Sequence, residues 1–332
     1  MKRWIVLCLS LLVLAGCAPV ASQDKGEEKK LSVVTTVFPA YDWVREIVGE
    51  NSENVDITWL MKSGVDVHSY QPTVDDLVTI SNCDVLVYVG GESESWMEEA
   101  LAQGGKEGRV VVNLMEELGD RVKEEEPLPG VEEDHDHDHD HDHDHDEEHQ
   151  HEMDEHIWLS LKNAVTLTQT LAQKLGQADP DHAQNYLDAQ KSYQTKLEQL
   201  DQEYQTMAQG AKYDTVLFCD RFPFRYLMDD YGIQYYAAFA GCSAETEASF
   251  ETVAFLATTL EGLDLPCVLT IEGSDGSLAR TVWENTSQNK QTVAQLNSLQ
   301  AVTQQQAQQG LTYLSAMEEN LQVLTKALNG VG

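Results

Sequence analysis

The sequence predicts an α/β protein of two lobes, each built on a parallel four-stranded sheet, with a helical segment between the lobes. Three observations support this fold class. The chain has 332 residues, which suits about two domains. Short apolar runs alternate with helical patterns in both halves, as in βαβ units. The stretch between the halves, residues 160–210, carries helical periodicity and no strand signal.

The first lobe is expected over residues 31–159. Its predicted strands are residues 31–38, 55–61, 84–89 and 109–114. Its predicted helices lie between them, at residues 40–49, 73–82 and 95–103. Because each strand is separated from the next by a helix, the sheet is expected to be parallel.

The second lobe is expected over residues 211–332 and repeats this scheme. Its predicted strands are residues 215–219, 233–239, 267–271 and 292–296. Its predicted helices are residues 224–230, 249–263, 277–286 and 303–328, the last broken near Gly310.

The segment between the lobes reads as two helical stretches. Apolar residues recur at helical spacing from Ala164 to Leu175, and Asp179-Pro180 then signals a new helix start. From Tyr186 to Met207 the apolar residues again recur at three and four positions. A helix of about 30 residues spans about 45 Å, enough to bridge two lobes as one rod. The alternative is a pair of packed helices on one lobe.

The chain opens with a secretion signal. Two basic residues precede an apolar run at residues 4–15, too short for a persistent membrane span, and the segment closes with Leu-Ala-Gly-Cys at Cys17. This ending looks like a bacterial lipobox, so residues 1–17 are expected to be processed and Cys17 lipidated. Residues 18–30 then read as a flexible linker. The protein is expected to be extracytoplasmic and lipid-anchored to the bacterial cell membrane; an ordinary signal peptide with a chance cysteine is the alternative.

The chain is strongly acidic, with 57 Asp and Glu against 21 Lys and Arg and a formal net charge of −36. Nucleic-acid binders need a basic surface, so a nucleic-acid partner is excluded. An electrostatic hold on anionic lipid is likewise disfavoured. Excess carboxylate suits cations as ligands, although solvated surface would give the same composition.

A histidine–aspartate run lies within a polar loop predicted over residues 124–153. Such a segment cannot bury a core and is expected to be disordered. Imidazole and carboxylate are ligands for zinc and its neighbours, so the run is expected to bind several ions loosely and reversibly. The alternative is a charged loop with no metal role in the cell. The loop histidines are His135, His137, His139, His141, His143, His145, His149 and His151.

Four metal-capable residues follow predicted strands, where ligands bind in open parallel sheets. His68 and His156 follow strands of the first lobe, whereas Asp220 and Glu272 follow strands of the second. Two imidazoles and two carboxylates make a four-coordinate site that suits zinc and tolerates manganese. We therefore predict a metal site in the cleft between the lobes.

Two of these residues lie in motifs that resemble a known family. Residues 64–72, Gly-Val-Asp-Val-His-Ser-Tyr-Gln-Pro, and residues 154–159, Asp-Glu-His-Ile-Trp-Leu, are similar to motifs of the metal-binding lipoproteins of zinc and manganese ABC importers. The resemblance extends over about residues 31–330, and the His-rich loop points to the zinc branch. It implies two α/β lobes joined by one long rigid helix, metal in the cleft, His68 and His156 as ligands, and an ABC permease as partner.

The second lobe departs from this family. Arg221 stands where the family usually has a ligating His or Glu, and Asn297 stands in place of an aspartate. Asp220 and Glu272 are therefore the preferred second-lobe ligands. Arg221 could instead pair with a carboxylate near the site. Two further carboxylates are the next candidates for a second-lobe ligand: Asp275 and Glu247.

Four cysteines remain after Cys8 and Cys17. Cys83 and Cys267 begin apolar strands and read as buried thiols. Cys219 and Cys242 lie at the carboxyl ends of second-lobe strands, where they could form a disulfide, supply a thiolate to zinc, or be unremarkable buried residues.

The sequence therefore predicts a monomeric, non-enzymatic substrate-binding lipoprotein that delivers zinc, with manganese as the alternative, to an ABC permease. It contains no His-Glu-x-x-His, Gly-x-Ser-x-Gly or glycine-rich phosphate loop. Two other functions stay open: a metal buffer without a transporter, and a metallohydrolase that uses the four predicted ligands around an open zinc position.

Overall fold

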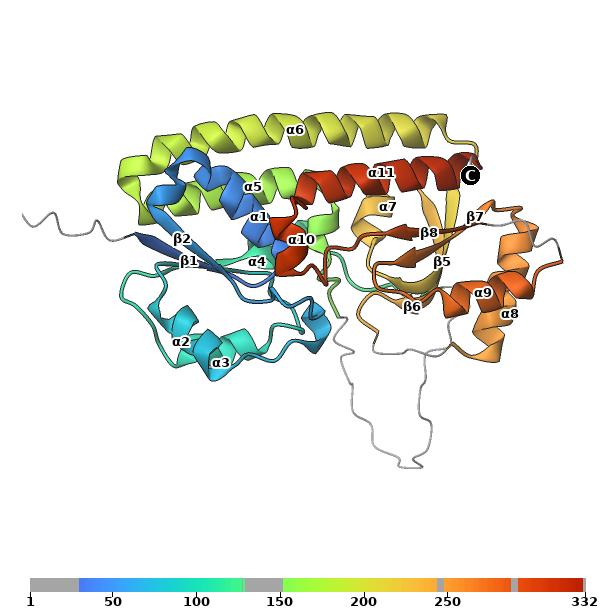
Figure 1. Cartoon of the computed structure of the whole chain (residues 1–332), viewed down its shortest axis with the longest axis horizontal. Coiled ribbons are helices and arrows are strands. Elements are labelled where there is room, and N and C mark those ends of the chain that lie inside the picture. The colour runs from blue at the N-terminus through green and yellow to red at the C-terminus, as the bar shows by residue number, and fades with distance from the viewer. Residues whose placement is uncertain (1–29, 127, 129–151, 244–247, 288–291, 331–332) are drawn as a thin grey trace, which may run out of the picture.

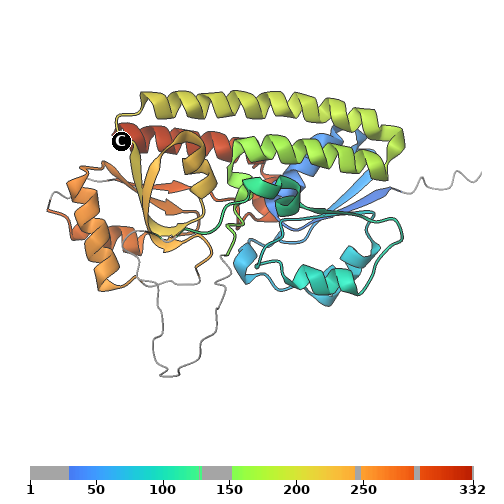
Figure 2. The ribbon, with the colours of Figure 1, turned by 180° about the vertical axis from the view of Figure 1, so that it is seen from behind.

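A computed structural model describes residues 30–126, 128, 152–243, 248–287 and 292–330. Two α/β lobes lie side by side, and long helices cover both of them along one side (Figures 1 and 2). Within this part of the chain, eight strands form two parallel four-stranded sheets, so the predicted fold class is confirmed. Among the described helices, none is both long and apolar enough to cross a membrane.

The first sheet has the strand order β2-β1-β3-β4. Its strands are β1 (Leu31–Thr35), β2 (Val55–Trp59), β3 (Val85–Tyr88) and β4 (Val110–Asn113). They are shorter than predicted, and at β1 and β4 the reason is that a helix begins before the predicted run ends. For example, the Asn113 side chain accepts hydrogen bonds from two backbone N–H groups and caps α4 (Leu114–Leu118), a helix the sequence did not predict. The other helices of this lobe are α1 (Phe38–Val48), α2 (Val74–Asn82) and α3 (Trp96–Ala102).

The second sheet has the order β6-β5-β7-β8. Its strands are β5 (Thr215–Phe222), β6 (Gln234–Ala240), β7 (Cys267–Ile271) and β8 (Thr292–Leu296). Strand β5 runs three residues further than predicted, and its register against β6 shifts between Phe218 and Arg221. The helices of the second lobe are α7 (Arg225–Tyr231), α8 (Phe250–Gly262), α9 (Ser277–Glu284), α10 (Gln304–Gln308) and α11 (Tyr313–Asn329). The predicted break at Gly310 separates the last two, where the φ of +100° favours glycine.

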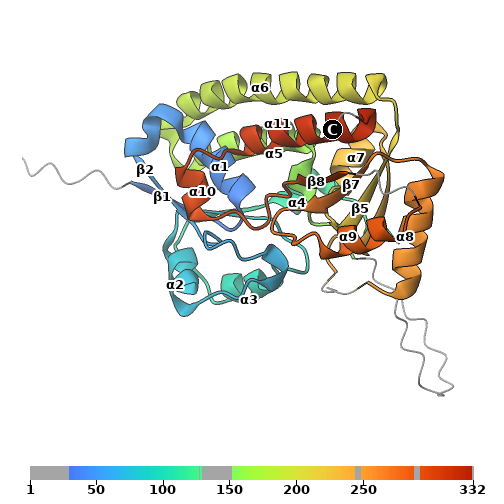
Figure 3. The same cartoon turned by 45° about the vertical axis from the view of Figure 1, so that its right-hand side comes forward.

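The segment between the lobes is a helical hairpin of α5 (Leu161–Ala178) and α6 (Ala183–Gly210). The 28 residues of α6 span about 42 Å at 1.5 Å per residue. Helix α6 contacts α1 in the first lobe and α7 and α11 in the second, and Figure 3 shows it along the length of the molecule. The structure thus combines both predicted arrangements: α5 and α6 pack together, and α6 bridges the lobes.

Buried hydrogen bonds fix the two lobes against each other. The Tyr313 hydroxyl at the start of α11 donates to the Trp158 carbonyl at 2.7 Å, and its backbone N–H donates to Asp42 in α1 at 2.7 Å. The indole N–H of Trp158 donates to the Ser298 carbonyl of the second lobe at 2.8 Å. One buried apolar cluster runs through β1, α6 and α11. The lobes therefore share a core.

Candidate metal site between the lobes

The two predicted histidines are held by similar turns. His68 lies in a 3₁₀ turn (Val67–Ser69) after β2, and its backbone N–H donates to Asp66 Oδ1 at 3.0 Å. His156 directly precedes a second 3₁₀ turn (Ile157–Leu159), and its N–H donates to Asp154 Oδ1 at 2.9 Å. In each Asp-x-His segment the aspartate therefore fixes the backbone of the histidine two residues later.

The structure brings these imidazoles together with their Nε2 atoms 3.2 Å apart. Nδ1 of His68 is 2.7 Å from Ser93 Oγ, and Nδ1 of His156 is 2.8 Å from Asp154 Oδ1. Because a carboxylate only accepts, Asp154 requires the proton of His156 on Nδ1, which leaves the Nε2 lone pair facing His68. Burial first, and then the neighbouring His156, lower the pKa of His68 to about 4. His68 is therefore an unprotonated imidazole at neutral pH, as a metal ligand must be.

Gln300 closes this pair from the second lobe. Its amide Nε2 lies 3.4 Å from Nε2 of His68 and also contacts Nε2 of His156. Gln300 follows β8 and is 6% exposed. Sequence reasoning missed it, because a glutamine carries no ligand signature and only its place three residues after Asn297 could have drawn attention to it.

Cys242, which follows β6, lies close to both His68 and His156. The metal-binding atoms of His68, His156 and Cys242 all lie within 4.8 Å of one another. Its backbone N–H donates to Glu125 Oε1 at 3.1 Å. Burial and then the nearby carboxylates, Glu125 first, raise the pKa of the Cys242 thiol far above its usual range. All four cysteines in the described residues are free thiols, so the disulfide considered between Cys219 and Cys242 is not formed here.

The two predicted carboxylates lie in the same hollow as His68 and Cys242, but not in the same close group. This interlobe hollow, of about 650 Å³, is lined by Asp220, Glu272, Arg221, His68 and Cys242 among others. Asp220 accepts the Arg221 backbone N–H at 2.9 Å. Both oxygens of Glu272 accept from Ser298, at 2.7 and 2.5 Å. Burial raises the pKa of Glu272, although these hydrogen bonds oppose the shift.

Arg221 reaches across the cleft to the first lobe. Its Nη2 lies 2.7 Å from Asp66 Oδ2, the side chain that also fixes His68. Burial alone would raise the pKa of Asp66, but the Arg221 guanidinium outweighs burial and lowers it. The pairing with a carboxylate that the sequence allows for Arg221 is therefore present.

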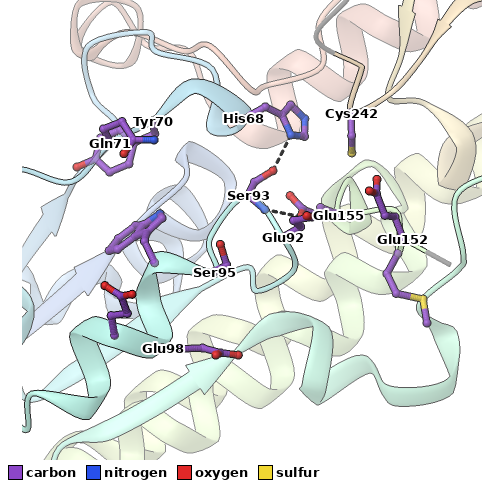
Figure 4. Close-up of a pocket in the computed structure, with 13 residues that line it drawn as sticks. His68, Tyr70, Gln71, Glu92, Ser93, Ser95, Glu98, Glu152, Glu155 and Cys242 are labelled. Atoms are coloured by element: carbon purple, nitrogen blue, oxygen red, sulfur yellow. Dashed lines mark hydrogen bonds between the residues drawn. The ribbon is translucent and has the colours of Figure 1, made fainter. Parts of the chain in front are cut away.

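A second, acidic hollow also borders His68 (Figure 4). It measures about 700 Å³, and its carboxylates are Glu92, Glu98, Glu99, Glu152 and Glu155. Burial raises the pKa of both Glu152 and Glu155. So many carboxylates at one opening give a negative potential that attracts cations.

The flanks of the predicted His-rich loop meet beside this hollow. The Glu125 N–H donates to the Glu152 carbonyl at 2.7 Å, and Glu124 forms a bridge with Met153. The loop histidines and Cys17 lie outside the described residues. The loop histidines are His135, His137, His139, His141, His143, His145, His149 and His151.

Comparison with known sequences identifies relatives along the whole chain. Residues 33–327 match the family model ZnuA, described as the periplasmic component A of a zinc-uptake complex. The high-affinity zinc uptake system protein ZnuA of Bacillus subtilis is 29% identical, and the match covers 98% of each chain. The zinc-binding lipoprotein AdcA of Streptococcus pneumoniae is also 29% identical over 98% of this chain, which spans only 62% of that protein.

Solved structures give the same result. The crystal structure of the metal-dependent lipoprotein YcdH from B. subtilis has a TM-score of 0.72 at 27% identity and covers 90% of this chain and 99% of its own. The Zn(II)-bound ZnuA-like domain of S. pneumoniae AdcA has a TM-score of 0.69 at 25% identity, with coverage of 90% and 99%. The two-lobe fold and the resemblance read from the motifs are therefore confirmed.

Proposed function

Because the chain belongs to the ZnuA family of zinc-uptake components, we propose that it captures zinc outside the cytoplasm and delivers it to the permease of an ABC importer. The observation that carries this proposal is the pair of facing Nε2 atoms of His68 and His156, 3.2 Å apart. Two nitrogens at about 2.0–2.1 Å from a tetrahedral zinc are about 3.3–3.4 Å apart. The imidazoles thus lie almost at the spacing that zinc requires.

The surroundings of this pair support capture rather than catalysis. His156 is fully buried, and Trp158 lies against it with ring centroids 5.4 Å apart. A catalytic zinc needs an exchangeable water facing a substrate, whereas a transport protein needs the ion enclosed. The burial of His156 favours enclosure, so we propose a binding protein and not a metallohydrolase.

Asp220 and Glu272 remain our proposed second-lobe ligands. Asp220 accepts a single described hydrogen bond, from its neighbour's backbone, so it has lone pairs left for a metal. Glu272 would first have to release Ser298. We therefore expect Asp220→Ala to weaken zinc binding more than Glu272→Ala, and Asn297→Ala to have a smaller effect than either. An unchanged affinity in both carboxylate variants would remove them from the site and leave the importer role standing.

The position of the loop flanks supports a collecting role for the His-rich segment. Glu152 and Met153 line the acidic hollow that leads to His68. Zinc held loosely by the loop would thus be released at the entrance to the tight site. Deleting residues 134–151 should remove several weak zinc sites and leave the tight one, as measured by calorimetric titration. Loss of the tight site on deletion would show that the loop itself is that site.

The membrane attachment and the partner are parts of the same proposal. We propose lipid attachment at Cys17, a monomeric chain, and an ABC permease as the acceptor of zinc, because relatives are named as zinc-uptake proteins or zinc-binding lipoproteins. Metabolic labelling with a fatty-acid analogue should mark the wild type and not Cys17→Ala. Zinc uptake by cells that lack the gene should be lower than in their parent.

The decisive experiment is a zinc competition titration of the mature protein. We expect one tight site, and His68→Ala or His156→Ala should weaken it by about a hundredfold or more, beyond the 10–100-fold typical of an outer partner. His182→Ala is the matched control, since His182 pairs with Asp179 at the start of the hairpin turn. If both site variants keep the wild-type affinity, the proposed function loses its site.

A further inference from the structure

We propose that Cys242 is a zinc ligand, so that the second lobe contributes a thiolate beside the two imidazoles and selects zinc over manganese. This inference rests on the proposed capture of zinc by His68 and His156. It assigns a soft sulfur ligand to one place of a site for which the sequence favours two imidazoles and two carboxylates and leaves a cysteine thiolate as an open alternative.

The geometry at the end of β6 carries the inference. The sulfur of Cys242 and one ring nitrogen of each histidine lie within 4.8 Å of one another, a span that small side-chain rotations close onto one ion. Figure 4 shows Cys242 beside His68 at one end of the acidic hollow. The Glu125 carboxylate accepts the Cys242 backbone N–H and fixes this residue at the cleft.

The neighbouring residue shows how closely the second lobe approaches the histidines. A Cβ at Gly241 would lie 3.0 Å from Cε1 and 3.2 Å from Nδ1 of His156. Only glycine leaves room for the backbone to pass against this imidazole. The close approach brings the next side chain, that of Cys242, into reach of the metal position.

Three other second-lobe groups either have another partner or lie outside this close group. Arg221 pairs with Asp66 and has no lone pair for a metal. Both oxygens of Glu272 accept hydrogen bonds from Ser298. Cys219 lines the interlobe hollow but lies outside the close group of ligand atoms. Among the His, Cys, Asp and Glu side chains of the described residues, Cys242 is therefore the second-lobe one whose ligand atom lies in the close group with both imidazoles.

The binding step balances with one proton released. Zinc forms a bond to Sγ of Cys242 as the S–H bond breaks, and the proton passes to the solvent, because a coordinating thiol is deprotonated by the ion. Cys242 then takes one of the two second-lobe places proposed for Asp220 and Glu272, and the remaining place of a tetrahedral site stays available to either carboxylate or to the oxygen of Gln300 after the amide turns. Thiolate favours zinc, whereas manganese prefers oxygen ligands.

Cobalt(II) spectroscopy tests the sulfur ligand directly. Cobalt replaces zinc in such sites, and a thiolate ligand gives an intense sulfur-to-cobalt charge-transfer band in the near ultraviolet. We expect the full-length mature protein to show this band and Cys242→Ser to lose it. Cys219→Ser is the matched control, since it removes a neighbouring buried thiol, and it should keep the band. A wild-type cobalt complex without the band, or a band that persists in Cys242→Ser, overturns the inference.

Competition titrations with zinc and with manganese test the selectivity. Cys242→Ser should weaken zinc binding by about a hundredfold or more, while its manganese affinity should stay within about threefold of the wild-type value. The zinc-over-manganese ratio should therefore fall, and urea unfolding of the metal-free variants shows whether each is folded. If Cys242→Ser keeps the wild-type ratio while His68→Ala loses zinc, Cys242 is no ligand and zinc capture stands. If the wild type itself shows no tight zinc site, the proposed function fails, and the inference about Cys242 fails with it.

Discussion

Replacing Gly241 with alanine should misplace one ligand of the proposed site without removing it. The added Cβ would lie 2.9 Å from the Phe222 carbonyl oxygen and 3.0 Å from Cε1 of His156. Ordinary van der Waals contact begins at 3.4 Å. The carbonyl is backbone at the end of β5, so the chain at residue 241 has to shift slightly, and the imidazole of His156 has to give way as well.

The structure sets the size of the effect. Relief of the contact with His156 requires a ring shift of about 0.4 Å, close to the tolerance of about 0.5 Å within which binding groups must be held. Extra atoms in a packed interior typically cost about 1–3 kcal/mol. If zinc binding has to pull His156 back into place, that cost appears in the affinity as a loss of about 5- to 150-fold.

A zinc competition titration of Gly241→Ala measures this loss, and urea unfolding of the metal-free variant measures the strain that remains without zinc. Gly210→Ala is the matched control, because a Cβ there meets nothing within 4 Å. We expect the control to bind zinc as the wild type does. If Gly241→Ala keeps the wild-type affinity within twofold, His156 is not held against β6 as the structure shows, and the reasoning is refuted.

Three further predictions concern groups around the site. Ser93→Ala removes the hydroxyl next to Nδ1 of His68, so zinc affinity should fall by about 10–100-fold in the same titration. Arg221→Met leaves Asp66 without its partner and should cost about 1–3 kcal/mol in urea unfolding. Burial raises the pKa of Glu94 to about 7, so the folded state keeps a proton that the unfolded state loses above about pH 4.5. The free energy of unfolding that this group contributes therefore falls as pH rises from about 4.5 to 7. Glu94→Gln should remove this pH-dependent loss, which is about 3 kcal/mol at most. An unchanged zinc affinity of Ser93→Ala would contradict the first prediction, and an unchanged urea midpoint of Arg221→Met would contradict the second. A stability–pH profile of Glu94→Gln parallel to that of the wild type would contradict the third.

Local periodicity was enough to predict the sheets. The apolar runs at Cys267–Ile271 and Thr292–Leu296 match β7 and β8 at both ends. Strand β5 was predicted to end at Cys219 but continues to Phe222, because its register against β6 shifts beyond Phe218 and lets pairing resume at Arg221. Charged residues such as Asp220 and Arg221 interrupt an apolar pattern, although the backbone pairs with β6 again from Arg221. Such an irregularity in pairing leaves no signal in hydrophobic spacing.

The candidate site was predicted unevenly, and the physical reason is distance along the chain. His68 and His156 each sit in an Asp-x-His turn whose hydrogen bonds are local, so their motifs were readable from a few residues. The approach of Cys242 and Gln300 to these histidines depends on how the second lobe is set against the first. No local pattern around Cys242 or Gln300 encodes that relation.

The relation between the lobes is set by buried residues that are not themselves proposed metal ligands. Tyr313 at the start of α11 donates to Asp42 of the first lobe and to the carbonyl of Trp158. Trp158, two residues after His156, in turn donates to the Ser298 carbonyl, in the segment that leads to Gln300. A chain of buried hydrogen bonds thus links the His156 turn directly to the β8 segment. Because unpaired buried groups are costly, this chain fixes which second-lobe side chains can reach the imidazoles.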